Sequence, residues 1–172
     1  MPERSVYRRS PNFGRRPEGT VVDCIVLHAD AGRSDAGTVS WIMAPASKVS
    51  YHFLVGRDGT VYQFVHTHLR AWHAGVSSFA GRQNVNDFSL GVAFANDQRG
   101  EPFSAAQLAA GVELVAGLCQ SYKIPLRRIT THAAISPGRK HDPGPLFPLE
   151  AFLADVGARL AAPPMDAPPG SG

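Results

Sequence analysis

The sequence predicts a single α/β domain with a central mixed β-sheet flanked by helices. Runs of β-branched and apolar residues, typical of buried strands, alternate along the chain with helical patterns. One pair of strands is joined by a short turn as a hairpin, so the sheet must contain an antiparallel pair. With 172 residues, 44% of them hydrophobic, the chain can bury a sizeable core without disulfides.

The chain divides into three parts that differ in composition. Residues 1–20 are rich in Arg, Pro and Gly and are expected to form an irregular arm that lies on the domain. Residues 21–160 are expected to form the domain itself. Residues 161–172 are rich in Pro and Ala and are expected to form a flexible tail or the stub of a linker.

The first half of the domain contains a predicted strand, helix and hairpin. Residues 21–28 are apolar and are expected to form a buried strand that ends at a histidine. Asp35 is expected to cap a short helix that runs towards Pro45. A hairpin is expected over residues 51–65, because an Asp-Gly pair in the middle supplies the turn.

The second half continues with a long loop and three further elements. The loop is expected over residues 71–87 and an apolar strand over residues 88–94. A helix is expected from Ser104 to about Tyr122, because Ser104 and Gln107 form a capping box. The remaining elements are a short strand over residues 128–132 and a last helix over residues 147–160.

Composition and charge limit the expected partners. The formal net charge is +3 and the basic residues are scattered, so an anionic partner is expected but nucleic acid is not. No apolar run reaches transmembrane length and the first residues lack the apolar core of a signal peptide. We therefore expect synthesis in the cytoplasm and no membrane insertion. Cys24 and Cys119 are expected to be buried, although the sequence leaves a disulfide between them open.

Candidate metal ligands stand at the ends of predicted elements. His28 and His132 end predicted strands, and Asp142 follows in a loop, residues 131–145, that is rich in Pro and Gly. Two imidazoles and one carboxylate, with a fourth position for water, form the ligand set of a catalytic zinc site. Scattered surface histidines in a solvated loop would give the same spacing, so both interpretations remain open at this point.

Six segments, in this order, resemble type-2 N-acetylmuramoyl-L-alanine amidases. They are Val26-Leu27-His28, Ser50-Tyr51-His52-Phe53 with Arg57-Asp58-Gly59-Thr60, Ala71-Trp72-His73-Ala74-Gly75, Asn86-Asp87-Phe88-Ser89-Leu90-Gly91, Thr131-His132, and Gly138-Arg139-Lys140-His141-Asp142-Pro143-Gly144-Pro145. The group includes short bacteriophage amidases, cytosolic muropeptide-recycling amidases and animal peptidoglycan-recognition proteins. The resemblance implies a mixed sheet flanked by helices, one zinc ion (Zn2+), and hydrolysis of the amide bond between N-acetylmuramic acid and L-alanine.

The resemblance also implies roles for individual residues. The zinc ligands would be His28, His132 and Asp142. Lys140 would be the catalytic lysine that stabilises the oxyanion, and Tyr51 would be the tyrosine that assists catalysis in the phage branch. An ordinary loop lysine and an ordinary strand tyrosine remain the alternatives for these two positions.

Further polar and aromatic residues are assigned by their place in the motifs. Four are expected at the substrate: Trp72 and His73 lining the groove, and Asn84 and Asn86 hydrogen-bonding sugar or peptide. His52 alternates with Tyr51 on its strand and is expected to be buried and hydrogen-bonded. Three other histidines, His66, His68 and His141, are expected at the surface.

Two positions depart from the recycling enzymes. The position that matches their glutamate base is Ala93, and the position that matches their carboxylate-binding arginine is Asn84. A methyl group cannot accept a proton, so catalysis would depend on zinc, Tyr51 and Lys140, as in the phage branch. We therefore expect a monomeric phage or prophage endolysin that degrades cell-wall peptidoglycan. The alternatives are a cytosolic recycling amidase acting on anhydromuropeptides and a peptidoglycan-binding module that no longer catalyses.

Overall fold

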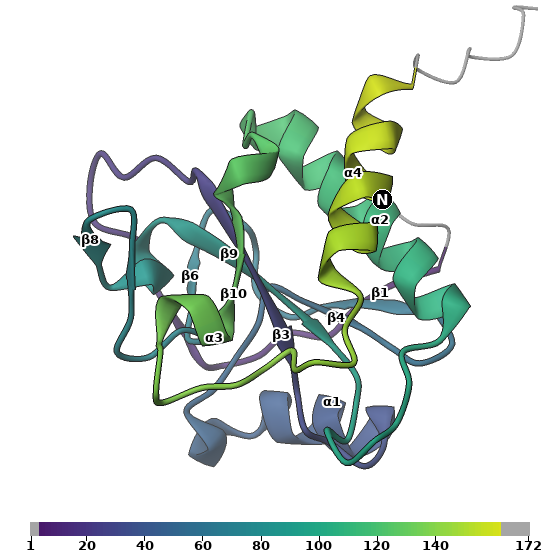
Figure 1. Cartoon of the computed structure of the whole chain (residues 1–172). Coiled ribbons are helices and arrows are strands. Elements are labelled where there is room, and N and C mark those ends of the chain that lie inside the picture. Colours follow the sequence, from purple (N-terminus) through teal and green to yellow (C-terminus); the bar gives the residue numbers. More distant parts are fainter. Residues whose placement is uncertain (1–3, 163–172) are drawn as a thin grey trace, which may run out of the picture.

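The computed structural model describes residues 4–162 and confirms the predicted α/β class (Figure 1). Six strands form one mixed sheet in the order β1-β5-β4-β9-β3-β10. The strands are β1 (Ser5–Tyr7), β5 (Val61–Gln63), β4 (Phe53–Val55), β9 (Ser89–Phe94), β3 (Cys24–Ala29) and β10 (Ile129–Thr131). The predicted hairpin is the antiparallel pair β4 and β5, and the other neighbours in this sheet are parallel.

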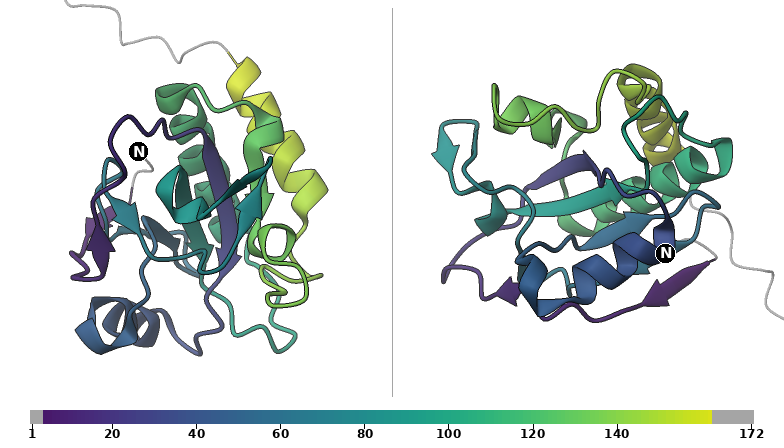
Figure 2. Two further views of the ribbon diagram at one scale, coloured as in Figure 1. Left: turned by 90° about the vertical axis from the view of Figure 1, so that its left-hand side faces the viewer. Right: turned by 90° about the horizontal axis from the view of Figure 1, so that it is seen from below.

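Helices lie on both sides of the sheet. Helices α2 and α4 lie side by side against one face, whereas α1 lies on the other side (Figure 2). The helices are α1 (Asp35–Met43), α2 (Ala105–Tyr122), α3 (His132–Ile135) and α4 (Leu149–Ala161), with the 3-10 turns η1 (Pro45–Ser47), η2 (Val85–Asp87) and η3 (Leu126–Arg128). Two small antiparallel sheets pair β2 (Phe13–Gly14) with β6 (Arg70–Ala71) and β7 (Ser78–Phe79) with β8 (Arg82–Gln83).

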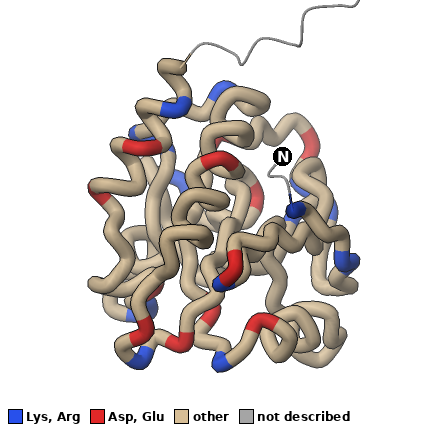
Figure 3. The backbone as a smooth tube through the Cα atoms, turned by 90° about the vertical axis from the view of Figure 1, so that its right-hand side faces the viewer, with Lys and Arg blue, Asp and Glu red and all other residues tan. Residues whose placement is uncertain are grey.

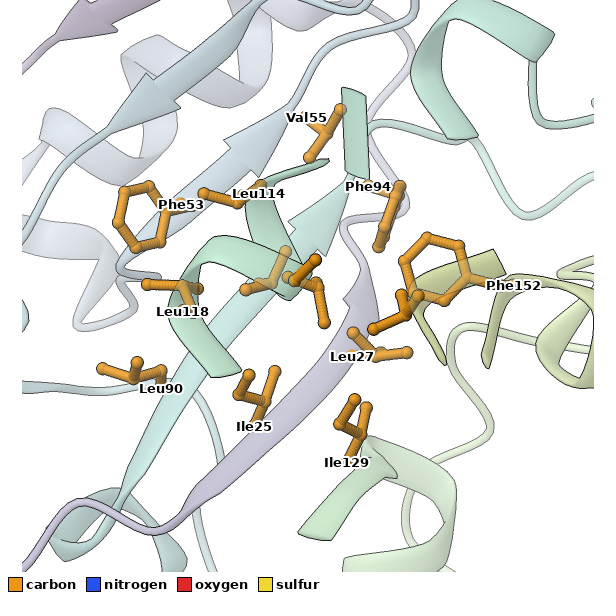
Figure 4. Packing of buried hydrophobic residues seen from close by; sticks show 14 of the residues in the cluster. Ile25, Leu27, Phe53, Val55, Leu90, Phe94, Leu114, Leu118, Ile129 and Phe152 are labelled. Atoms are coloured by element: carbon orange, nitrogen blue, oxygen red, sulfur yellow. The ribbon is translucent and has the colours of Figure 1, made fainter. Parts of the chain in front are cut away.

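The side chains of β3 alternate between two cores. Ile25 and Leu27 point to the face that α2 and α4 cover, where they pack with strand and helix residues such as Phe94 and Phe152 (Figure 4). Val26 belongs to a second cluster on the opposite face. Because successive side chains in a strand point to opposite faces, His28 lies on the same face as Val26 and turns away from the helix-covered core.

The N-terminal segment, expected to form an irregular arm, contains two short strands. Strand β1 pairs with β5 at the edge of the main sheet, and β2 pairs with β6. These strands have three and two residues, too few to show an alternating pattern in the sequence. They form because a strand elsewhere in the chain offers them unpaired backbone groups. At the other end, α4 includes Ala161, and residues 163–172 of the expected tail lie outside the described part.

Two predicted helix caps need revision. Ser34, rather than Asp35, caps α1, because its Oγ accepts a hydrogen bond from the Gly37 N–H at 3.2 Å. Asp35 is the first residue of the helix, where the helix dipole favours a carboxylate. Ser104 caps α2 as predicted, but the Gln107 side chain does not return to the cap. Its amide instead donates to two backbone carbonyls at the ends of β4 and β9, which ties the helix to the sheet.

Charge and thiol groups follow the sequence-based expectations. Cys24 and Cys119 are buried free thiols that belong to different core clusters. Basic and acidic positions are interspersed on the side of the molecule that Figure 3 shows. Within residues 4–162, no helix combines the length and the apolar character that a membrane crossing requires.

Arg16 fastens the N-terminal segment to the domain. Its guanidinium donates to four backbone carbonyls, those of Thr67, Asn86, Asp87 and Ser89, at 2.7–3.1 Å. Burial lowers the pKa of Arg16 to about 10. This one cation therefore joins the N-terminal segment to the end of η2, the start of β9 and the loop between β5 and β6.

Replacing Arg16 should destabilise the fold. Arg16→Met leaves four partly buried carbonyls without a donor, which should lower the free energy of unfolding by roughly 2–4 kcal/mol. The measurement is urea unfolding followed by circular dichroism. The matched control is Arg15→Met at the exposed neighbouring position, which should change the stability by no more than about 0.5 kcal/mol. Equal effects of the two substitutions would contradict this assignment.

His52 is buried and hydrogen-bonded, as predicted. Its Nδ1 accepts from the Gly91 N–H at 2.9 Å, so the ring proton resides on Nε2, which lies 3.1 Å from the Leu69 carbonyl oxygen. Burial, assisted by the nearby charge of Arg16, lowers the pKa of His52 to about 3. Protonation of Nδ1 would also break the bond to Gly91, so the folded state holds this imidazole neutral.

Acid should therefore destabilise the metal-free protein through His52. An unfolded histidine takes up a proton near pH 6.5, whereas folded His52 does not. The contribution of neutral His52 to the free energy of unfolding is therefore complete above pH 6.5 and is lost as the pH decreases towards 3. Between pH 7.5 and 5.0, wild type should lose about 2 kcal/mol more than His52→Gln. Urea unfolding at both pH values measures this difference. His68→Gln, at an exposed histidine, is the matched control and should lose as much as wild type.

Candidate metal centre and active site

Three proposed metal ligands meet where β3 and β10 end. The two strands are parallel neighbours, with Thr131 opposite Leu27, so the next residues, His28 and His132, stand side by side. His132 does not end the strand as predicted; it is the first residue of α3, whose cap is Thr131. The Ala133 N–H donates to the Asp142 carbonyl oxygen at 3.0 Å, which closes the loop and returns Asp142 to the same place.

The donor atoms face one another at nearly equal distances. His28 Nδ1 lies 3.0 Å from His132 Nδ1 and 3.3 Å from Asp142 Oδ2, and His132 Nδ1 lies 3.1 Å from Asp142 Oδ1. A tetrahedral zinc site with bonds of about 2.0–2.1 Å places its ligand atoms about 3.3 Å apart. The two nitrogens and the carboxylate therefore fit one small divalent cation, a fit that scattered surface histidines would not have.

The protonation states of this group suit a metal. Burial, reinforced by the charges of His132 and Lys140, lowers the pKa of His28 to about 4 even though the neighbouring carboxylate opposes the shift. Burial alone would raise the pKa of the Asp142 carboxyl, but its close contacts with the His132 and His28 imidazoles hold this pKa below its usual range. At neutral pH the site thus offers a neutral His28 imidazole and an ionised carboxylate, which are the forms that bind metals.

The Nε2 atoms of both imidazoles, on the side away from the proposed metal position, have hydrogen-bond partners within the protein. His132 Nε2 lies 3.2 Å from the Ala74 carbonyl oxygen, which can only accept, so Nε2 carries the proton and Nδ1 has the free lone pair. On the other ligand, His28 Nε2 lies 3.0 Å from His73 Nδ1. Asn86 Oδ1 accepts from both the His73 and the Ala74 N–H groups, at 3.0 and 2.8 Å.

His73 and Asn86, expected at the substrate, lie mostly within the protein. His73 is 5% exposed and Asn86 is 7% exposed, and both ring nitrogens of His73 and the side-chain oxygen of Asn86 have partners within the protein. Each borders the cavity at the candidate metal site, and their hydrogen bonds support the segment that backs the two imidazoles. Trp72 borders the same cavity as expected, whereas the exposed Asn84 lines the neighbouring cavity and not this one.

Tyr51 and Lys140, the two predicted catalytic residues, also border the metal-site cavity, which has a volume of about 420 Å³. The ring of Tyr51 lies 5.1 Å from that of His28, centroid to centroid. Burial, with a smaller contribution from the charges of Asp142 and Asp30, raises the pKa of Tyr51 above its usual value. Tyr51 is therefore a neutral phenol that can donate a hydrogen bond but is not available as a base.

The structure places Ala93 directly beside the first ligand. Ala93 pairs with His28 in the register of β9 and β3, so its methyl group lies on the same face as the imidazole. It is completely buried in an apolar cluster with Leu54 and Ile42, against which Tyr51 packs. The position that would carry a carboxylate base is therefore filled by hydrocarbon.

Two further cavities adjoin the central one. A cavity of about 660 Å³ shares Gly75, Asn86 and Arg139 with it, and a cavity of about 300 Å³ shares Asp30, Trp41, Val49 and Tyr51. Trp41 and Arg139, to which the sequence assigns no role, both border the central cavity. No local pattern in the sequence indicates that both border one groove.

The other histidines lie where the sequence predicts them. His66, His68 and His141 are exposed, and the ring of His66 stacks on those of Tyr7 and His68. None of these three belongs to the His28, His132 and Asp142 group. The candidate centre is therefore built from residues of β3, α3 and the loop after α3, with support from the segment after β6.

Known proteins resemble this chain in sequence and in fold. A family model described as N-acetylmuramoyl-L-alanine amidase matches residues 18–145. The 1,6-anhydro-N-acetylmuramyl-L-alanine amidase AmpD of Haemophilus influenzae is 36% identical over 166 residues, which cover 86% of this chain and 90% of that protein.

Two solved structures extend the comparison. The selenomethionine derivative of AmpD has a TM-score of 0.75 at 29% identity and covers 91% of this chain and 96% of that chain. Escherichia coli AmiD, in complex with the substrate anhydro-N-acetylmuramic acid-L-Ala-D-gamma-Glu-L-Lys, has a TM-score of 0.71 at 28% identity and covers 82% and 60%. This chain therefore belongs to the N-acetylmuramoyl-L-alanine amidase family of enzymes.

Proposed function

We propose that this chain is a zinc amidase that cleaves the bond between N-acetylmuramic acid and L-alanine in soluble 1,6-anhydromuropeptides. The observation that carries the proposal is the convergence of His28, His132 and Asp142 on one point. The Haemophilus relative, which this chain matches over 90% of its length, is a 1,6-anhydro-N-acetylmuramyl-L-alanine amidase. This supports a recycling enzyme over the endolysin expected from the sequence. A module that only binds peptidoglycan would have no need of all three donors.

The residues around the cavity suit amide hydrolysis. A zinc ion held by the three donors would lower the pKa of a bound water and polarise the scissile carbonyl. Lys140 borders the cavity two residues before Asp142, so its ammonium can stabilise negative charge on the carbonyl oxygen as the amide is attacked. Tyr51 can donate its phenolic hydrogen to the same oxygen, because its raised pKa keeps it protonated.

The two outer cavities suggest how the substrate lies. Arg139 borders the larger one and anchors one guanidinium nitrogen on Ala74, Val76 and Ser136, so its cation is held at this end of the groove. A stem peptide carries carboxylates, which this end would attract. Trp41 borders the smaller cavity and is 59% exposed, and its indole offers an apolar face to a sugar ring. We place the peptide on the Arg139 side and the sugar on the Trp41 side.

A wall-degrading amidase is the second candidate, favoured by the absence of a carboxylate at Ala93. The two functions differ in their substrates, which are intact sacculi for the lytic enzyme and soluble 1,6-anhydromuropeptides for the recycling enzyme. Both share the bond that is cleaved. A single product analysis on the two substrates therefore separates them.

Purified protein loaded with one equivalent of zinc should release peptides with a free L-alanine amino terminus. Mass spectrometry should detect this release much faster from anhydro-N-acetylmuramyl-tripeptide than from sacculi. A chelator or His132→Ala should abolish the activity, because either removes the metal. His141→Ala, at the exposed neighbour of Asp142, is the control and should bind zinc normally. Faster release from sacculi would support the lytic enzyme instead, and zinc binding without any peptide release would contradict both.

Trp41→Ala should weaken binding of substrates that carry a second sugar. Loss of one aromatic contact should raise KM roughly three- to tenfold for N-acetylglucosaminyl-anhydromuramyl-tripeptide, with kcat little changed. KM for the one-sugar substrate should change less. Met43→Ala, at another exposed apolar residue of α1, is the matched control and should leave both KM values unchanged. Equal changes for the one-sugar and two-sugar substrates would contradict the proposed orientation.

A further inference from the structure

His73 is a buried histidine that the proposed chemistry does not use. It stands behind His28, with its Nδ1 3.0 Å from His28 Nε2. Its other nitrogen, Nε2, lies 3.1 Å from Ser89 Oγ. Ser89 in turn donates its hydroxyl hydrogen to the Val85 carbonyl oxygen at 2.6 Å. These four groups form one continuous hydrogen-bonded chain that ends at the proposed metal site.

The direction of every hydrogen bond in this series of four groups follows from the Val85 carbonyl at its end. A carbonyl oxygen can only accept, so the single hydroxyl hydrogen of Ser89 is committed to Val85. Ser89 Oγ must then accept from His73 Nε2–H. A neutral imidazole carries one N–H, so His73 Nδ1 is an acceptor, and His28 must donate to it from Nε2.

The ring of His73 has little freedom to change this assignment. Its backbone N–H is bonded to Asn86 Oδ1 at 3.0 Å. On the other side, a methyl group added at Gly91 would lie 2.5 Å from His73 Cγ, so the ring packs directly against the backbone of β9. Asn86 thus holds the backbone of His73, and Gly91 leaves the room that its imidazole fills.

We propose that His73, oriented by Ser89, is a positioning residue that keeps His28 in the tautomer with the proton on Nε2. Its effect is to present the lone pair of His28 Nδ1 to the point that faces His132 and Asp142. His132 obtains the same tautomer more directly, from the Ala74 carbonyl. Two consecutive residues therefore orient both proposed histidine ligands. The inference rests on the proposed metal site, but the tautomer itself is a property of the metal-free protein.

Nitrogen-15 NMR of histidine-labelled, metal-free protein tests the tautomer directly. Long-range proton–nitrogen spectra should show His28 and His73 each protonated at Nε2, with Nδ1 of both rings unprotonated. In Ser89→Ala, His73 loses the acceptor that fixes its proton, so His28 should show a mixture of tautomers. Ser77→Ala, at another buried serine with hydrogen bonds to nearby backbone, is the matched control and should leave the His28 signals unchanged. A wild-type His28 protonated at Nδ1 would overturn the proposal.

Zinc affinity, measured by competition with a chromophoric chelator, gives a second readout. His73→Leu should weaken zinc binding roughly 10- to 100-fold, the range found when a partner of a metal-bound histidine is lost. His73→Gln should recover much of this loss, because its side-chain oxygen can accept from His28 Nε2. Circular dichroism and urea unfolding show whether each variant is folded. Unchanged affinity in folded His73→Leu, or equal loss in folded His73→Gln, would overturn the proposal. Failure of wild type to bind zinc would instead contradict the proposed function, and the NMR result would still stand.

Discussion

The site depends on one side-chain amide. Asn86 Oδ1 accepts from two consecutive backbone N–H groups, those of His73 and Ala74, and so sets the path of the segment after β6. That path places the His73 ring behind His28 and the Ala74 carbonyl behind His132. A change at Asn86 would therefore disturb both imidazoles together, although Asn86 touches neither. Buried polar groups act in this way when each member of the network has its partner.

The parallel strands of the main sheet determine where His28 and His132 lie. Because β3 lies between β9 and β10 and pairs in parallel with both, the residues that follow the three strands emerge at one edge. His28 and His132 meet at this edge although 104 positions separate them in the chain. The helix-covered face has the larger apolar core, so the opposite face of β3 is left to carry His28. Parallel pairing and strand alternation together determine which histidines can share a metal.

The chemistry of the site follows from what stands next to His28. Ala93 contributes a buried methyl group there, and Tyr51 contributes a phenol that burial keeps neutral. Neither can accept a proton at neutral pH, so neither can act as the base in the proposed hydrolysis. The groove then extends from this centre towards Arg139 on one side and Trp41 on the other. The cationic Arg139 end of this groove is complementary to an anionic peptide, and its Trp41 end offers an apolar face to an uncharged sugar.

Local patterns in the sequence determined the central strands, the hairpin and the two long helices, because hydrophobic periodicity and caps act over a few residues. The motifs also indicated the residue types of the proposed ligands. Tertiary structure alone decided that residues 5–7 and 13–14 form strands, since these pair only with strands that are distant in the chain. It also decided the roles of His73 and Asn86. The spacing of histidines in a sequence does not indicate which ring nitrogen donates a hydrogen bond and which accepts one. The neighbours of each histidine in the folded protein determine its tautomer.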